Sequence, residues 1–304
     1  MKGSRAYGHG SRRAWRARGS RGTSARLVDV RATSGVGTPE HDAHRVEEVP
    51  EAIATGAVAA VYADIRRVLG VPFVALVFRV LASEPGRLEA IWADLGPNLG
   101  SDVAARAAKR LVVQPPANLG LRRGGHGPNL DSAAAVATLR AYHHTNALNL
   151  IGLAALLDGV EGPRAPGHAP SAQRPEETIL PMADLSALPR RTVALLEEMS
   201  APIAGPERPI VIPSLFRHFA HDHPDLEFIW TTIRAQVEAP DFSEGTAVTV
   251  RRARRLASSL PFRVRRVEDP ESRRIAERFT RTIAAMLVVG SLVELALVGS
   301  KPSS

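Results

Sequence analysis

The chain has 304 residues, of which 44% are hydrophobic and 23% charged, and it contains no cysteine. This length and composition are typical of a soluble globular protein with a sizeable core. The lack of cysteine excludes disulfides, iron–sulfur clusters, thiolate zinc sites and a cysteine nucleophile. The sequence also lacks the GxGxxG and GxxxxGK[ST] nucleotide-binding motifs, the HExxH metalloprotease motif and the GxSxG hydrolase motif. Composition alone therefore names no function.

The positive charge is concentrated in residues 1–45, which contain ten basic and three acidic side chains. The net charge of the whole chain is +8. This tail is rich in Gly, Ser and Arg and lacks apolar periodicity, so we expect it to be disordered and solvated. The alternative is that this tail alone binds nucleic acid, through its arginines and through Tyr7 and Trp15, which lie between them. No apolar segment follows Arg12-Arg13, so no export signal is indicated and we expect a cytoplasmic protein.

From residue 51 onward the apolar residues recur at helical spacing. The first such stretch ends at Gly70, a typical helix stop. Strand-like alternation is nearly absent outside Pro209–Ile212. The pattern therefore predicts an all-α protein. Further helices are expected around 101–113, 132–159, 185–199, 246–259 and 271–298.

The helical part of the sequence contains an internal repeat in two copies. Phe78–Trp92 reappears as Phe216–Trp230, with seven of fifteen positions identical and no insertion or deletion between the two copies. A Val-Pro or Ile-Pro pair precedes each copy, and a basic helix and a long apolar helix follow it. A repeat of this length that occurs in two copies predicts two pseudo-symmetric helical repeats, with a pocket at their junction. Trp92 and Trp230 are then equivalent core anchors.

A proline-rich segment separates the copies, and prolines forbid helix there. The predicted organisation is a disordered basic tail (1–45), a first helical repeat (46–161), a Pro-rich linker (162–178) and a second helical repeat (179–300). The apolar run 283–299 is short for a membrane span, and Glu294 within it would be costly at the centre of a bilayer. We expect a buried core helix and no membrane.

The run Val61-Tyr62-Ala-Asp64-Ile65-Arg66, the pair Val71-Pro72 and the segment from Phe78-Arg79 to Trp92 closely resemble the group I 2-haloacid dehalogenases. The resemblance extends over roughly residues 50–300. It implies an all-α protein of two repeats, commonly a homodimer, that hydrolyses the carbon–halogen bond of short 2-haloacids without metal or cofactor. In that family a carboxylate base and an asparagine activate water, which attacks C2 directly.

Carried onto this sequence, the family's asparagine falls on Asn146, which would position the water. Its pocket tryptophan falls on Phe73, the serine before its catalytic aspartate on Ser214, and an aromatic phenol of its last helix on Phe279. The aspartate itself falls on Leu215, which cannot accept a proton. The resemblance thus implies a 2-haloacid dehalogenase-like hydrolase whose base is missing. The alternative is a non-catalytic or differently catalytic protein that binds a small organic acid at the repeat junction.

Other residues offer substitutes for the missing base. His143 or His144 would titrate in the right range, and a shifted alignment would bring Glu207 to the base position. Arg79 or Arg217 would hold a carboxylate if either faces the junction. His218 and His221 share one helical face, which is a metal-ligand spacing. The first repeat has an ordinary helix end at the same place, however, so we expect no metal site.

Overall fold

The computed structural model describes residues 46–112, 132–165, 178–205 and 210–298. These residues all belong to one compact unit, 39–304, and the expected tail, 1–45, lies outside the described residues. The described part consists of ten α-helices and two short 3₁₀ helices. It contains no β-strand, only an isolated antiparallel bridge between Val160 and Val264. The predicted all-α class is confirmed.

The helices form two runs on either side of the linker. The first run is η1 (Glu51–Ile53), α2 (Gly56–Leu69), α3 (Leu76–Leu81), α4 (Arg87–Leu99), α5 (Asp102–Leu111) and α6 (Ser132–Asp158). The second run is η2 (Leu185–Ala187), α7 (Arg190–Ala204), α8 (Ser214–His218), α9 (His223–Val237), α10 (Pro240–Ala257) and α11 (Pro270–Val298).

Local sequence explains where these helices start and stop. Helix α2 ends at Gly70, which adopts the left-handed conformation (φ 62°) that L-residues avoid. The predicted helix at 185–199 instead starts at Arg190, because Pro189 cannot continue a helix from the preceding turn. The helix predicted at 246–259 starts earlier, at Pro240, where the fixed φ of proline suits the first helical position.

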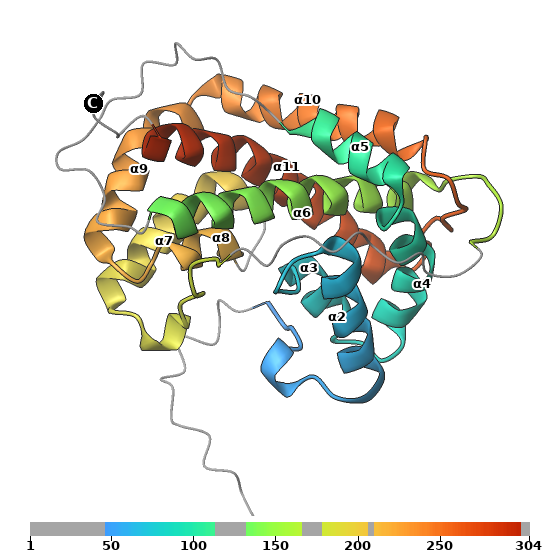
Figure 1. The fold of residues 1–304 in the computed structure, drawn as a ribbon. Helices are drawn as coiled ribbons and strands as arrows, with labels where there is room; N and C mark the ends of the chain where they lie inside the picture. Colours follow the sequence, from blue (N-terminus) through green and yellow to red (C-terminus); the bar gives the residue numbers. More distant parts are fainter. Residues whose placement is uncertain (1–45, 113–131, 166–177, 206–209, 299–304) are drawn as a thin grey trace, which may run out of the picture. The chain divides into compact units, whose positions relative to one another are not determined.

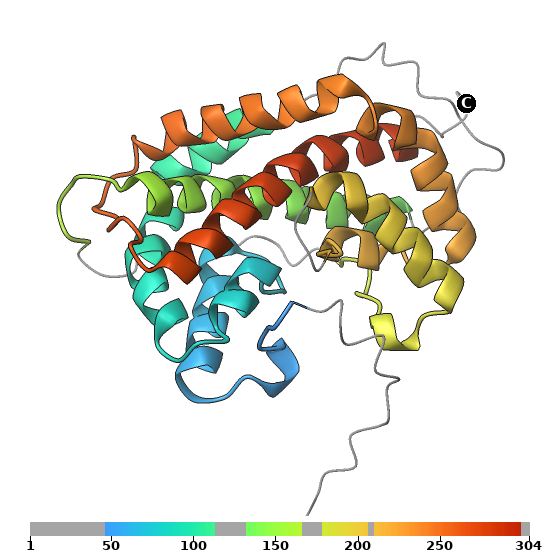
Figure 2. The same ribbon diagram turned by 180° about the vertical axis from the view of Figure 1, so that it is seen from behind.

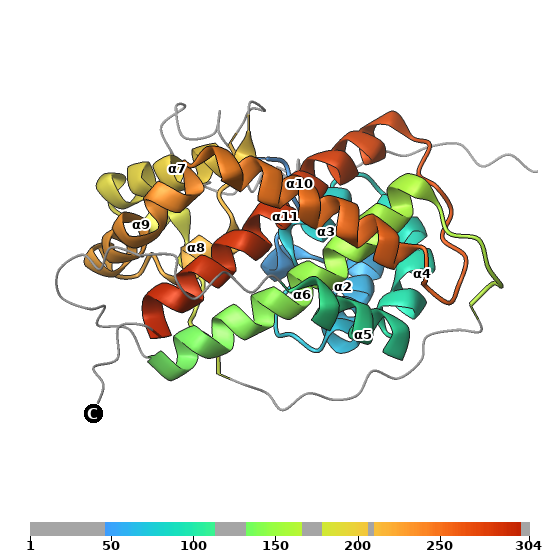
Figure 3. The ribbon, with the colours of Figure 1, turned by 90° about the horizontal axis from the view of Figure 1, so that it is seen from above.

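The two longest helices, α6 and α11, pack against each other in an antiparallel pair (Figure 1). Helices α5 and α10 cover one side of this pair, and both contact α6. Seen from behind, α2, α3 and α4 gather at one end of the pair and α7, α8 and α9 at the other (Figure 2). The view from above shows α10 lying over α11 (Figure 3). The pair α6–α11 therefore connects the two runs of helices.

Two clusters of buried apolar side chains form the core. The first combines α2–α6 with residues of α10 and α11, and the second combines α7–α9 with parts of α6 and α11. The two tryptophans occupy matching places, one in each cluster. The indole N–H of Trp92 donates to Asp64 (2.9 Å) and that of Trp230 to Glu198 (3.0 Å). Both are buried, as expected of core anchors.

The two repeated segments have the same order of elements, with α3, a turn and α4 in one, and α8, a turn and α9 in the other. The domain boundaries and the pseudo-twofold relation stay predictions, and part of the linker lies outside the described residues. Within the described residues, one helix is long and apolar enough to cross a membrane, at Pro270–Leu297. In its most apolar stretch 72% of the residues are buried, as in the core helix of a soluble protein.

Candidate active site

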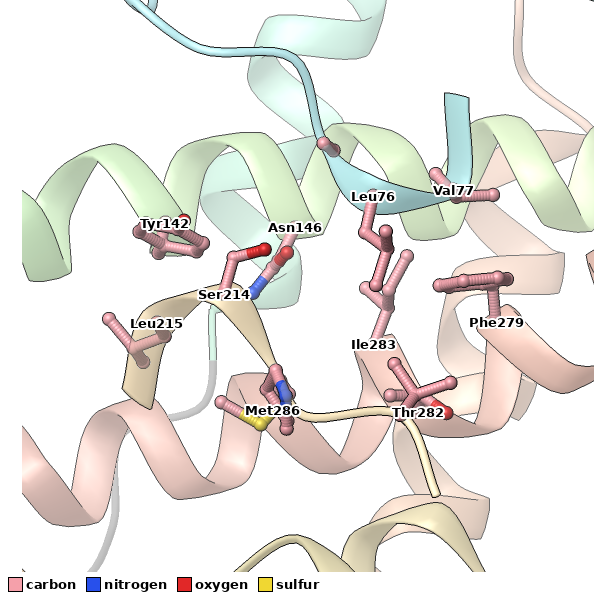
Figure 4. A pocket seen from close by; sticks show the side chains of 13 residues that line it. Leu76, Val77, Tyr142, Asn146, Ser214, Leu215, Phe279, Thr282, Ile283 and Met286 are labelled. Atoms are coloured by element: carbon pink, nitrogen blue, oxygen red, sulfur yellow. The ribbon is translucent and has the colours of Figure 1, made fainter. Parts of the chain in front are cut away.

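A pocket lies where α3, α6, α8 and α11 meet (Figure 4). It encloses about 460 Å³ of unfilled space, counting solvent at its open side. Most of its wall is apolar, and its polar side chains are Tyr142, Asn146, Ser214 and Thr282. The remaining lining residues are Ala75, Leu76, Val77, Val211, Pro213, Leu215, Phe279, Ile283 and Met286.

The two short helices present equivalent positions of the repeat to this pocket. Leu76 and Val77 begin α3, and Ser214 and Leu215, their counterparts in the second copy, begin α8. Each pair follows an extended segment that contains a proline, which cannot extend the helix backwards. The pocket therefore lies between the two halves of the chain, at the place where the repeat predicts a junction.

Four residues named from the family resemblance line this pocket together. Asn146 comes from the middle of α6, Ser214 and Leu215 from the start of α8, and Phe279 from α11. The side chains of Asn146 and Ser214 point into the space between α6 and α8 (Figure 4). Leu215 is only 1% exposed and presents a hydrocarbon side chain to the pocket. The role of each of these residues stays a prediction.

Two other named residues are not among those that line the pocket. Phe73 stacks on Tyr142, with ring centroids 4.7 Å apart, and so lies behind the pocket wall. His143 faces α11 instead, where its Nε2 is 3.3 Å from the Glu294 carboxylate and its ring packs on Gly290. Burial lowers the pKa of His143, although Glu294 opposes this effect. This position gives no support to His143 as a substitute base for the pocket.

The sequence analysis gave Tyr142 no role in the pocket and considered His218 only as a metal ligand. The Tyr142 hydroxyl is 3.0 Å from Nε2 of His218, which lies at the end of α8. Tyr142 precedes Asn146 by one helical turn and so lies on the same face of α6, a spacing that was visible in the sequence. The contact with His218 joins α6 to α8, far apart along the chain, and no sequence pattern marked it.

Neither His218 nor His221 is among the described residues that line the pocket. His218 and His221 contact the carbonyl oxygens of Leu180 and Pro181 at 2.6 and 2.8 Å. Among the described residues, no group of three or more His, Asp or Glu side chains could hold a metal ion. Glu207 lies outside the described residues.

Two arginines lie close enough to Tyr142 for their charges to act on its hydroxyl, although neither lines the pocket. Burial raises the pKa of Tyr142 above its ordinary value of 10, while the charges of Arg79 and Arg217 lower it by more than Glu51 raises it. Arg79 forms an ion pair with Glu48, with Nε and Oε2 2.9 Å apart. Arg217 donates to the Ala183 carbonyl.

No protein-family model matches the sequence, and no curated protein is significantly similar to it. Solved structures do match it. A complex of D-2-haloacid dehalogenase with L-LA matches at a TM-score of 0.67 and 16% identity, covering 84% of this chain and 97% of that chain. A D-2-haloacid dehalogenase mutant with D-2-CPA matches at the same TM-score and identity, and the match covers 96% of that chain. A further D-2-haloacid dehalogenase mutant matches at 0.63, with 16% identity. The chain therefore has the all-α fold of D-2-haloacid dehalogenase.

Proposed function

We propose that the pocket binds a short 2-substituted carboxylic acid, and that the protein is a 2-haloacid dehalogenase-like hydrolase whose carbon–halogen hydrolysis is weak. The observation that carries this proposal is the joint placement of Asn146, Ser214 and Leu215 in one pocket between the two halves of the chain. The solved structures of the same fold hold L-LA and D-2-CPA, which supports a small acid as the ligand class.

The electrostatics of the pocket support an acid as the ligand. Arg79 and Arg217 make the edge at Tyr142 positive, and the apolar wall suits the short hydrocarbon body of the acid. The Asn146 amide supplies hydrogen-bond donors that a carboxylate or an attacking water can use. We propose no metal or cofactor for this chemistry, since direct attack by water needs only a base and an oriented water.

Hydrolysis is expected to be weak because the position of the base holds Leu215. A positioned general base contributes about 10²- to 10⁴-fold in rate, which corresponds to roughly 3–5 kcal/mol of barrier. None of the described residues that line the pocket carries a carboxylate or an imidazole. The same observation favours the second candidate function, a binding protein for a small organic acid that performs no hydrolysis.

Halide release from each enantiomer of 2-chloropropionate, measured with purified protein, tests the proposal. Release by the unmodified protein should be slow, and Leu215→Asp should raise it by about 10²-fold or more. Leu215→Asn is the matched control, because it introduces a similar buried polar group without a base. Adding Asn146→Ala to Leu215→Asp should remove the gain.

The outcomes separate the two candidate functions. Rescue by aspartate but not by asparagine supports a dehalogenase-type site that lacks its base. Binding of the acid without rescue by a folded Leu215→Asp variant supports the binding protein. Rapid turnover by the unmodified protein would contradict the role given to Leu215. The family resemblance also leads us to propose a cytoplasmic homodimer, which light scattering coupled to gel filtration would test.

A further inference from the structure

A buried chain of hydrogen bonds runs from the backbone of Leu180 to the edge of the pocket. Nδ1 of His218 is 2.6 Å from the Leu180 carbonyl oxygen, and Nε2 of His218 is 3.0 Å from the Tyr142 hydroxyl. The side chain of Ser214 acts to lower the pKa of the same phenol, so it lies close to the pocket end of this chain. His218 is 4% exposed and Tyr142 7%, so water has little access to the inner part of this chain.

The Leu180 end of this hydrogen-bond chain determines which atoms donate and which accept. A carbonyl oxygen only accepts hydrogen bonds, so Nδ1 of His218 carries the proton. Burial lowers the pKa of His218 to about 4, so the ring is neutral near pH 7 and Nε2 has a lone pair. The Tyr142 hydroxyl must therefore donate to Nε2. Its proton points along the chain, so the Tyr142 oxygen offers only lone pairs to a ligand.

The other polar side chains of the pocket complete the pattern. The Thr282 hydroxyl donates to the Arg278 carbonyl (3.2 Å) within α11, so its proton is also used. The amide of Asn146 carries two N–H groups and points into the pocket (Figure 4). Among the described side chains that line the pocket, the Asn146 amide thus supplies N–H donors and a carbonyl acceptor, and Tyr142 supplies an acceptor whose proton is already used.

Resting on the proposed function, we propose that the pocket selects short 2-hydroxy acids over 2-haloacids. The carboxylate accepts from the Asn146 amide N–H groups, and the 2-hydroxyl donates to the oxygen of Tyr142. A halogen at the same carbon cannot donate a hydrogen bond, so it would face the lone pairs of the Tyr142 oxygen. The loss of the base at Leu215 then fits a pocket that recognises an acid bearing a hydroxyl group rather than one that expels a halide.

Calorimetric titration of the purified protein at pH 7 tests the selection, with each enantiomer of lactate and of 2-chloropropionate and with propionate as the reference. One hydrogen bond between neutral groups corresponds to about 3- to 10-fold in Kd. We expect one enantiomer of lactate to bind about that much more tightly than propionate, and 2-chloropropionate to gain no such advantage. Free halide is measured after each titration, because hydrolysis would convert the chloro acid into the hydroxy acid.

Two variants test the chain itself. His218→Phe removes the acceptor of the Tyr142 proton, so the hydroxyl becomes free to donate into the pocket and the preference for lactate should disappear. His221→Ala is the matched control, because His221 lies nearby in the sequence and bonds Pro181 outside the chain. It should keep the preference. Tyr142→Phe, which preserves the ring that stacks on Phe73, should weaken lactate binding more than propionate binding and so reduce the preference.

The failures of the two proposals are distinguishable. Equal affinities for lactate and 2-chloropropionate in the unmodified protein would overturn the selection and leave the organic-acid pocket standing. A preference that survives in both His218→Phe and Tyr142→Phe would also overturn it. If none of the acids binds, the proposed function is wrong, and the selection is wrong with it.

Discussion

Acidification from pH 7 to pH 4.5 is expected to destabilise the protein through His218. In the unfolded chain this histidine has a pKa of about 6.5, whereas burial lowers its pKa to about 4 in the folded protein. Between these values the unfolded state binds a proton that the folded state does not, so stability falls as the pH falls through this range. Below about pH 4 both states are protonated, and the loss is complete.

The magnitude follows from the separation of the two pKa values. A full shift from 6.5 to about 4 corresponds to roughly 3 kcal/mol, and about 2 kcal/mol of this is lost between pH 7 and pH 4.5. His218 is 4% exposed, so solvent screens this effect little. For a protein whose whole stability is about 5–15 kcal/mol, the loss is readily measured.

Urea unfolding followed by circular dichroism at several pH values measures this loss. The comparison is between the unmodified protein and His218→Gln, which cannot titrate. Other groups that titrate in this range, such as His143, contribute equally to both proteins and cancel in the difference. The stability difference between the two proteins should shrink by about 2 kcal/mol on going from pH 7 to pH 4.5. A difference that does not change with pH would refute the neutral, buried state of His218.

Three glycines give further predictions, all measured as changes in the free energy of unfolding. Gly290→Ala should destabilise the protein by about 1–3 kcal/mol, because the new Cβ would lie 3.1 Å from Cε1 of the enclosed His143 ring. Gly152→Ala, whose Cβ would meet the flexible end of Leu99 at 3.4 Å, should cost less, and a reversed order would contradict this packing. Gly70→Ala should cost about 1–2 kcal/mol, since Gly70 closes α2 with φ at 62°; no loss would mean that the chain ends this helix differently.

The helical class could be read from the sequence because each helix carries its own apolar period and stop signals. The starts of helices near prolines were predicted less accurately, because α7 and α10 begin at other residues than the sequence pattern indicated. Asn146, Ser214, Leu215 and Phe279 could be named through resemblance, and the fold brings them together in one pocket. Local pattern cannot reveal which distant side chains meet, so the pairings of Tyr142 with His218 and of His143 with Glu294 required the structure.

The first hydrophobic cluster has a consequence for how the chain is made. Besides residues of α2–α6, this cluster includes Leu256 of α10 and Leu287 of α11, close to the end of the chain. A nascent chain that has emerged only as far as the linker therefore lacks part of the wall of its first core. Because domains generally fold as units, we expect the first half to complete its folding only after α10 and α11 have been made. Until then the apolar faces of α4, α5 and α6 stay exposed to other chains, which makes synthesis rather than the finished fold the stage most vulnerable to aggregation.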